Sequence, residues 1–332
     1  MVRAQQAMRV FITGATGFIG VHLCRRLVER GDQVSALVRS PRKAAALPGA
    51  VKLVEGDLSL FADPRAELPP SDVVIHLAGV VAADNLGQYE AINYRAVADL
   101  IACIGRQSWK PRRLLFSSSL AAAGPTEHGI ELTERDPMRP IDPYGDAKAR
   151  AEALVRGAPF PTTIFRPPSV LGPGDEQSLT LFRAARSRVG FRVAGEAQGL
   201  SFVDVRDLVE AIVLMADDRR TSSHCYYASY PSPTNVRDLW RELERAVRRR
   251  VFVVPLPRWL LYVAMRAATV AAAVFRFKNQ LDAKQYAQMV APAFLCSSAS
   301  LRAELGWLPR HDLADCLAHA AEGYRVAGLL RA

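Results

Sequence analysis

Three glycines spaced three residues apart constrain the fold of this chain more than any other feature. They are Gly14, Gly17 and Gly20, within the stretch Val10–Gly20. The apolar run Arg9–Ile12 before them predicts a buried strand, whereas the apolar residues after Gly17 recur at helical spacing. Glycine lets backbone N–H groups approach a phosphate closely, and the N-terminus of a helix favours negative charge. The pattern G-x-x-G-x-x-G between a strand and a helix therefore predicts a dinucleotide-binding turn.

The chain up to Ser117 continues as alternating strands and helices. Further strands are predicted at Gln33–Val38, Val51–Val54, Val73–Leu77 and Arg113–Ser117, and a helix is predicted from about Tyr89 to Gln107. Such alternation is typical of an α/β fold with a doubly wound parallel sheet, whose ligand crevice lies at the carboxyl ends of the strands. His76, inside the fourth strand, is expected to be a packed core residue rather than a catalyst.

The composition indicates a globular chain with a large core, because half of the 332 residues are apolar. The five cysteines are scattered, which favours a reducing compartment and argues against disulfides or a metal site. Only eight residues precede the first predicted strand, so we expect no signal peptide and a cytoplasmic location. The net charge is +10, but the basic run Arg241–Arg250 contains Glu242 and Glu244. It is expected to be a solvated helix face rather than a nucleic-acid site.

The end of the second predicted strand bears on the choice of cofactor. A sheet of this kind places an acidic residue there on the adenosine ribose when the cofactor is NAD. This chain has Arg39 instead, followed by Arg42 and Lys43. A 2′-phosphate would pair with these cations, so NADP(H) is the preferred cofactor; if they are ordinary surface cations, NAD(H) stays open. Asp57, after the third strand, is a candidate acceptor for the adenine amino group.

A chemical constellation follows the fifth predicted strand. That strand ends in Ser117–Ser119, and Tyr144 and Lys148 lie one helical turn apart at the start of a predicted helix. We expect the Lys148 ammonium to favour the phenolate and to bring the pKa of Tyr144 nearer to the working range. A serine hydroxyl would then hydrogen-bond the substrate oxygen while Tyr144 gives or takes its proton and a nicotinamide supplies the hydride.

Taken together, these motifs resemble the extended short-chain dehydrogenase/reductase family over nearly the whole chain. The markers are Thr13–Gly20, Gly56–Leu58, His76–Gly79, Ser117–Ser119, Tyr144–Lys148, Arg166–Asp175, Leu305–Pro309 and Tyr324–Arg325. The resemblance implies a Rossmann-like sheet and a smaller, mainly helical C-terminal part that binds the substrate. On this basis, residues 8–172 with 201–224 form the dinucleotide-binding domain, and residues 173–200 with 225–332 form the substrate-binding part.

Carried over to this sequence, the resemblance makes Ser119, Tyr144 and Lys148 the catalytic residues, with Lys148 also on the nicotinamide ribose. The predicted cofactor contacts are Gly14, Thr16, Gly17, Phe18, Ile19, Gly20, Arg39, Asp57, Leu58, Leu77, Ala78, Gly79, Asn93, Ser117, Tyr144, Lys148, Pro167 and Ser169. No metal is expected. Homodimers are common among similar proteins, so a homodimer is an open expectation.

Departures from the family pattern separate the activities. Leu120 and Ala121 stand where sugar dehydratases look to need an acidic pair, so dehydration is not expected. Ser169 and Leu200 stand where nucleotide-sugar epimerases typically carry asparagine and arginine. The segment Leu120–Ala123 is small and apolar, which suits a hydrophobic ketone or alcohol. It resembles the branch of the family that contains dihydroflavonol 4-reductase-like and 3-beta-hydroxysteroid dehydrogenase-like enzymes.

The sequence therefore predicts an oxidoreductase that interconverts a carbonyl and a secondary alcohol on a bulky, apolar substrate. Two alternatives stay open. One is a nucleotide-sugar 4-epimerase with tightly bound NAD, and the other is a cofactor-binding scaffold without turnover.

Residues 257–278 are the least family-like segment. The helical spacing gathers Arg258, Tyr262, Arg266, Thr269 and Arg276 on one side of an otherwise apolar helix. A transmembrane helix needs about 20 uninterrupted apolar residues, and a central arginine costs about 3 kcal/mol, so this helix is not expected to span a bilayer. Three interpretations are open: an apolar face packed on the substrate-binding part, a lid over an apolar substrate, and peripheral contact with an anionic membrane surface.

Overall fold

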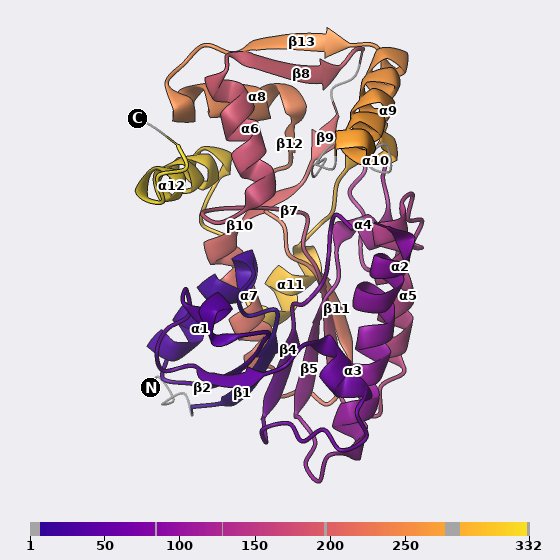
Figure 1. Ribbon diagram of the computed structural model, residues 1–332, viewed down its shortest axis with the longest axis vertical. Helices are drawn as coiled ribbons and strands as arrows, with labels where there is room; N and C mark the ends of the chain where they lie inside the picture. The colour runs from indigo at the N-terminus through magenta and orange to yellow at the C-terminus, as the bar shows by residue number, and fades with distance from the viewer. Residues whose placement is uncertain (1–6, 84, 128, 196–197, 276–285, 331–332) are drawn as a thin grey trace.

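The fold is built on a sheet of seven parallel strands (Figure 1). The computed structural model describes residues 7–83, 85–127, 129–195, 198–275 and 286–330. In spatial order, the strands of the main sheet are β11 (His224–Tyr227), β6 (Thr162–Arg166), β5 (Arg113–Ser117), β4 (Val73–His76), β1 (Arg9–Thr13), β2 (Gln33–Val38) and β3 (Lys52–Glu55).

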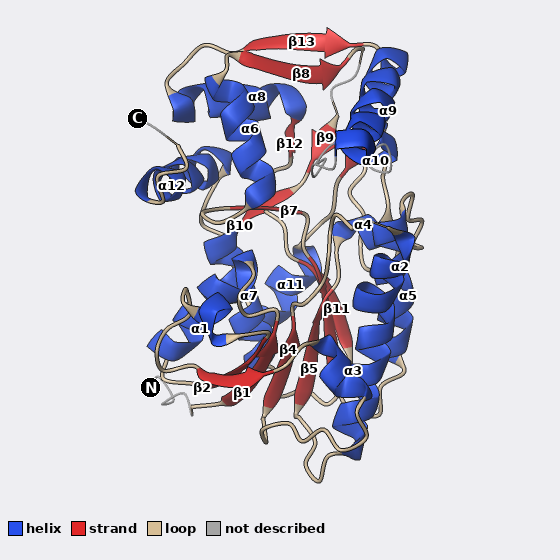
Figure 2. Cartoon of the chain, viewed as in Figure 1, coloured by secondary structure: helices blue, strands red, loops and turns tan. Residues whose placement is uncertain are grey.

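Helices cover both faces of this sheet (Figure 2). Helices α1 (Phe18–Glu29) and α7 (Val205–Asp217) lie on one face, and α3 (Ala96–Arg106) and α5 (Pro143–Arg156) lie on the other. Side chains alternate between the two layers as strand geometry requires: Val10 and Ile12 of β1 pack with α1 and α7, whereas Phe11 packs with α3. The predicted doubly wound α/β fold is confirmed.

The winding direction reverses between β1 and β4. From β1 the chain moves outward to β2 and β3, and it then returns to place β4 on the other side of β1. Ligands of such sheets bind at this reversal, outside the carboxyl ends of the strands. The glycine turn follows β1, so it lies at this position.

The connection between β4 and β5 differs from the single helix that the sequence predicts. It consists of a short helix α2 (Leu86–Gln88), a π-helical segment η3 (Tyr89–Arg95) and then α3. Apolar spacing over this length fits an α-helix, and a local change to i→i+5 hydrogen bonds leaves no clear trace in that spacing.

The second part of the molecule lies beyond the carboxyl ends of the main sheet (Figure 1). Its core lies between α6 (Glu176–Arg186), α8 (Val236–Val247) and α12 (Leu313–Val326), around the buried side chains of Phe182, Trp240 and Tyr324. Small sheets complete it: β8 (Val189–Val193) with β13 (Phe252–Leu256), β7 (Ser169–Leu171) with β10 (Phe202–Asp204), and β12 (Thr234–Asn235) with β9 (Gly199–Leu200) and β14 (Ala293–Phe294).

Two segments lie elsewhere than the sequence predicts. Phe202–Asp204 was expected to return to the main sheet, but this segment pairs with β7 in a separate sheet, and only the following helix α7 packs on the main sheet. Residues 225–227, grouped with the substrate-binding part in the sequence, belong to β11, which pairs with β6 as the edge strand of the main sheet. A four-residue apolar run carries no information about which edge it joins.

The segment after β13 is the amphipathic helix α9 (Arg258–Phe275) that the sequence predicts. Leu261 and Met265 are buried against α10 (Tyr286–Val290), whereas Arg258, Tyr262 and Arg266 are exposed. Thr269 is half-buried, and Arg276 lies outside the described residues. Within the described part of the chain, no helix is both long and apolar enough to cross a membrane.

Candidate active site

A cavity of about 560 Å³ opens at the carboxyl ends of the central strands. Its lining combines the glycine turn after β1, the serine run after β5, the start of α5 and the loop after β6. Twelve of the predicted cofactor contacts line it: Gly14, Gly17, Phe18, Ile19, Gly20, Leu77, Gly79, Ser117, Tyr144, Lys148, Pro167 and Ser169. Ser119 lines it as well. The cavity thus contains all three residues of the predicted catalytic triad.

The glycine turn is shaped by close backbone contacts. Gly14 has a φ of +76°, and a Cβ there would lie 2.6 Å from the Ala78 nitrogen. A Cβ on Gly20 would lie 2.7 Å from the backbone of Ala15. Gly17 differs, because it is the N-cap of α1 and the nearest atom to its Cβ would be the Gly14 oxygen at 3.2 Å.

The N-terminus of α1 fits an anionic group. It faces the cavity, no side chain caps its free N–H groups, and its first turn holds no acidic residue. Free N–H groups and the helix dipole favour an anion at this place, and the missing side chain of Gly17 leaves the approach open. These features fit the pyrophosphate of a dinucleotide.

Lys148 is held under the loop that follows β4. Its side chain is 3% exposed, its Nζ donates to the Ser117 carbonyl at 2.7 Å, and it lies 4.9 Å from the ring centre of Phe116. Burial lowers the pKa of Lys148 to about 8, with the charge of Glu152 acting in the opposite direction. A Cβ on Gly79 would lie 3.2 Å from the Lys148 Nζ, so the loop passes directly over the ammonium.

Tyr144 and Ser119 meet from different elements. Ser119 caps α4 (Leu120–Ala123) with its hydroxyl, which accepts from the Ala121 N–H at 3.1 Å, and Tyr144 lies in the first turn of α5. Burial raises the pKa of Tyr144 to about 12, while a side-chain hydrogen bond with Ser119 acts against that rise. Lys148 is not among the causes of this pKa shift, since its ammonium donates to the Ser117 carbonyl.

The π-helical segment η3 holds the backbone of the loop that follows β4. Asn93 is fully buried; its amide accepts from the Val80 N–H at 2.9 Å and donates to the Val80 carbonyl at 2.8 Å. Tyr89, one turn earlier, donates to the Val81 carbonyl at 3.0 Å and accepts from the Ala83 N–H at 3.2 Å. The segment thus fixes the loop over Lys148, a use of π-helical geometry that is frequent at functional sites.

A buried ionic network binds the serine run Ser117–Ser119 through Ser118. Glu152 on α5 receives two bonds from Arg166, at 2.8 and 2.7 Å, and one from the Ser118 hydroxyl at 2.6 Å. Arg166 also donates to the Tyr227 hydroxyl at 3.0 Å. Charge-assisted bidentate pairs of this kind are strong and geometrically specific, so the network orders the segment from which Ser119 projects.

Six predicted cofactor contacts do not line the cavity: Thr16, Arg39, Asp57, Leu58, Ala78 and Asn93. Arg39 is exposed at the carboxyl end of β2, and Asp57 is exposed just beyond β3. Asp57 accepts from the N–H and hydroxyl of Ser59, which lower its pKa together with the nearby charge of Arg39. The two side chains thus lie near each other at the adenosine end that the sequence predicts.

The opposite end of the cavity is mainly apolar. The apolar side chains there are Val81, Leu120, Ala121, Leu200, Met289 and Phe294, and the polar ones are Asp175, Gln177, Ser201 and Gln288. Met289, Gln288 and Phe294 were not predicted, and no local signal in the sequence marks them, since they lie more than 140 residues after Tyr144. The packing of α9 and α10 brings Gln288 and Met289 to the site, and the pairing of β14 with β9 brings Phe294.

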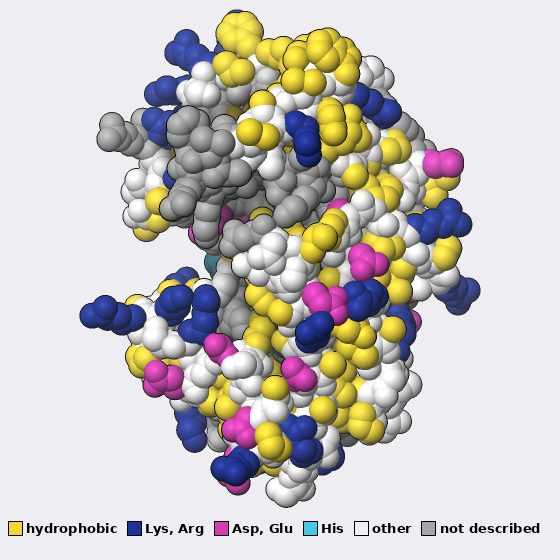
Figure 3. All heavy atoms as spheres, turned by 45° about the vertical axis from the view of Figure 1, so that its right-hand side comes forward, with side chains coloured by type: hydrophobic (Ala, Val, Ile, Leu, Met, Phe, Trp, Pro, Cys, Tyr) yellow, Lys and Arg dark blue, Asp and Glu magenta, His cyan; other side chains and the backbone are white. Residues whose placement is uncertain are grey.

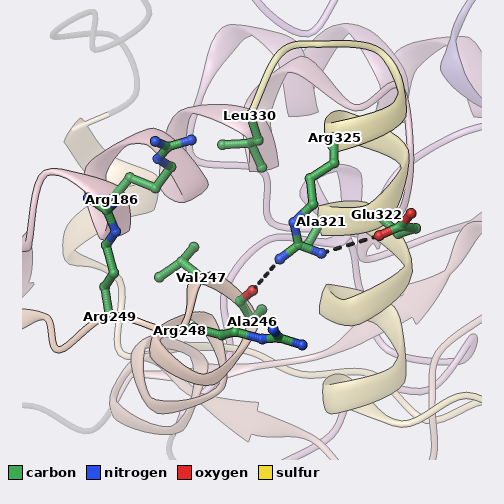
Figure 4. Close-up of a pocket in the computed structure, with 9 residues that line it drawn as sticks. All are labelled: Arg186, Ala246, Val247, Arg248, Arg249, Ala321, Glu322, Arg325 and Leu330. Carbon is green, nitrogen blue, oxygen red and sulfur yellow. Dashed lines mark hydrogen bonds and ion pairs between the residues drawn. The ribbon is translucent and has the colours of Figure 1, made fainter. Parts of the chain in front are cut away.

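Another cavity, of about 440 Å³, lies at the C-terminal ends of α6, α8 and α12 (Figure 4). Four arginines line it, and Arg325 donates to the Ala246 carbonyl at 2.8 Å and pairs with Glu322 at 3.3 Å. Arginines commonly satisfy the free carbonyls of helix C-termini. None of the predicted site residues lines this cavity.

Comparisons with known proteins agree with this geometry. The family model described as "NAD dependent epimerase/dehydratase family" matches residues 10–227. A ceramide reductase of Caulobacter vibrioides is 34% identical over 212 residues, which are 61% of this chain and 59% of that protein. A UDP-glucose 4-epimerase of Vibrio cholerae is 26% identical over 75% of this chain and 79% of that protein.

A solved structure shows the same fold. MoeE5 in complex with UDP-glucuronic acid and NAD superimposes with a TM-score of 0.74 at 23% sequence identity, over 96% of this chain and 99% of that one. The alignment therefore covers both the main sheet and the second part of the molecule.

Proposed function

The chain belongs to the NAD-dependent epimerase/dehydratase family and is an NAD(P)-dependent enzyme of the extended short-chain dehydrogenase/reductase type, and from this premise we propose that it reduces a carbonyl, or oxidises a secondary alcohol, on a bulky apolar substrate. The observation that carries the proposal is the composition of the cavity. Ser119, Tyr144 and Lys148 share it with an apolar wall that includes Leu120 and Leu200.

The proposed mechanism uses each of the three residues once. The Ser119 hydroxyl donates to the substrate oxygen, and the Tyr144 hydroxyl gives that oxygen its proton. Burial raises the pKa of Tyr144, so its hydroxyl is protonated at neutral pH and has a proton to give. The chemistry that a nicotinamide cofactor would supply here, when bound, is hydride transfer to the carbonyl carbon. Lys148 places a positive charge between the Ser117 carbonyl and the cavity and orients the cofactor ribose.

The scarcity of hydrogen-bonding side chains in the apolar wall of the cavity supports an apolar substrate. Hydroxyls of a sugar need hydrogen-bond partners, because an unpaired polar group loses free energy on burial. Leu120, Ala121 and Leu200 offer no side-chain donor or acceptor, and the polar groups at this end of the cavity are few, Gln177 and Gln288 among them. The similar protein of Caulobacter vibrioides is named a ceramide reductase, which is consistent with a reductase assignment.

The runner-up is a nucleotide-sugar 4-epimerase. It is supported by the similarity to a UDP-glucose 4-epimerase over three quarters of the chain. The same triad would oxidise and re-reduce one sugar carbon, and NAD would stay bound. A cofactor-binding scaffold without turnover is the third alternative.

Assays with purified protein separate the three proposals. NADPH or NADH oxidation is followed with 2-decanone and acetophenone, and conversion of UDP-glucose to UDP-galactose is followed without added cofactor. Consumption of the reduced cofactor with a ketone supports the reductase. Sugar conversion with no net cofactor consumption supports the epimerase, and cofactor binding without either reaction leaves the scaffold.

Replacing the proposed acid tests the mechanism. Tyr144→Phe is expected to lower turnover at least about 100-fold, because general acids contribute about that much, while the dissociation constant of the cofactor changes little. Tyr94→Phe is the matched control, since Tyr94 packs on Arg150 outside the cavity. Undiminished turnover of Tyr144→Phe would remove Tyr144 from the mechanism.

A further inference from the structure

An apolar surface lies on the outside of α9 and β13. Among the described side chains of α9, Trp259, Val263 and Val270 are exposed, with Trp259 67% exposed. On β13, Phe252 is 71% exposed, and Val254 lies on the same face two residues later. Figure 3 shows hydrophobic side chains gathered at this end of the molecule. We call Phe252, Val254, Trp259, Val263 and Val270 the α9 surface.

The charge along the part of the sequence that contains the α9 surface has one sign. Between Glu244 and Asp282 the sequence contains seven arginines and one lysine and no acidic residue. Of these cations, Arg258 and Arg266 are exposed on α9 itself. A solvent-exposed helix of a soluble domain usually mixes both signs of charge. An apolar helix whose own charged residues are all cations, as in α9, is typical of helices that lie in the surface of an anionic bilayer.

We propose that the α9 surface docks the protein on a membrane that contains anionic lipid. A second copy of the chain is a poorer occupant. Two-fold pairing would set the arginines of one α9 against those of the other, and like charges repel. A bilayer surface brings the opposite charge, and its headgroup region accepts the exposed indole of Trp259.

Helix α9 lies between the proposed membrane surface and the cavity of the active site. The inner face of the helix, Leu261 and Met265, packs with Met289 of α10. Met289 and its neighbour Gln288 line the apolar end of the cavity. A docked molecule therefore holds the apolar end of its cavity next to the lipid. Entry of an apolar substrate from the bilayer at this position rests on the proposed function. The docking itself does not depend on that function.

Vesicle sedimentation of the full chain tests the docking. The parent protein is expected to pellet with phosphatidylcholine vesicles that contain phosphatidylglycerol, and to pellet less as salt is raised, since screening weakens the attraction. The double variant Phe252→Glu with Trp259→Glu is expected to lose at least about tenfold in partition coefficient. Leu308→Glu with Val326→Glu is the matched control, because these two residues are 72% and 81% exposed elsewhere on the molecule.

Several outcomes would overturn the proposal. These are no pelleting of the parent protein, equal pelleting with pure phosphatidylcholine, or equal losses in the two double variants. A parent dimer that Trp259→Glu converts to a monomer would assign the α9 surface to a second copy instead. Melting temperatures check that each variant is folded. Turnover of 2-decanone in solution is measured in parallel, so a failure of docking is distinguished from a failure of the proposed reaction.

Discussion

Single residues at the site show how far environment changes the properties that a sequence pattern suggests. The spacing of Tyr144 and Lys148 correctly places both on the cavity. Their protonation depends on burial, which raises the pKa of one to about 12 and lowers that of the other to about 8. Both shifts favour the neutral form, as burial in a medium of low dielectric constant does. The spacing of two residues along a helix contains no information about how burial changes their pKa values.

Arg39 is the residue that decides between the two cofactors in our proposal. Arg39→Asp is expected to raise the Kd of NADPH at least about tenfold and to change that of NADH much less, because only NADPH carries a phosphate to pair with the guanidinium. Fluorescence titration of each cofactor measures both constants. Lys52→Asp, at the amino end of the neighbouring strand β3, gives the same change in charge away from the site. Equal effects of Arg39→Asp on the two cofactors would contradict the phosphate contact.

At the scale of elements, the sequence predicts regular strands well and local departures poorly. The bounds of β2 and β5 agree with the prediction, because their apolar runs are bounded by turn residues. The π-helical segment was not predicted, nor was the partner strand of β10. Each depends on hydrogen bonds that local spacing does not specify.

The residues of the candidate site also fall into two groups, those that the local sequence predicts and those that it does not. The triad and the glycine turn could be predicted, since each is a short local motif. The support around them could not. Glu152 and Arg166 meet only after α5 and β6 pack together, and Met289 reaches the cavity only through α9 and α10.

The glycine turn allows stability and cofactor binding to be separated within one element. Gly20→Ala forces a Cβ against the backbone of Ala15 and is expected to lower the free energy of unfolding by about 2 kcal/mol or more. A Cβ on Gly17 would lie 3.2 Å from the Gly14 oxygen, a tight contact that a small shift relieves, and the extended backbone there suits any residue. Gly17→Ala should keep the parent melting temperature within about 2 °C but bind the cofactor more weakly, because its methyl group lies at the anion site.

Urea unfolding and cofactor titration of the two variants check this prediction. Similar loss of stability in both would show that Gly17 is also required by the fold. Unchanged cofactor affinity of Gly17→Ala would argue against a pyrophosphate at the N-terminus of α1.

For the whole molecule, one buried histidine links stability to pH. His76 is fully buried in β4 and its Nδ1 lies 2.7 Å from the Thr13 hydroxyl, whereas no described residue pairs with its Nε2. Burial, with a smaller effect of the Lys148 charge, lowers its pKa from 6.5 to about 3. The unfolded chain therefore binds a proton below pH 6.5 that the folded chain does not bind until about pH 3. Stability is highest above this range and falls as the solution is acidified.

Comparison with a His76→Asn variant isolates this contribution. Each pH unit below 6.5 is expected to cost the parent about 1.4 kcal/mol through His76, and the variant avoids this cost. The stability difference between parent and variant should thus shrink by about 2 kcal/mol from about pH 7.5 to about pH 5. Urea unfolding at the two pH values measures it. A difference that does not change with pH would show that His76 takes up a proton in the folded state.

The contact of Leu261 and Met265 with Met289 also has a thermodynamic consequence. Binding free energies at two sites on one molecule are linked reciprocally. If a partner on the outer face of α9 shifts that helix against Met289 and so changes the affinity of the cavity for its ligand, then filling the cavity must change the affinity for that partner by the same factor. A substrate and a product that bind the cavity with different effects on α9 would then give the enzyme different affinities for the partner on the outer face of that helix.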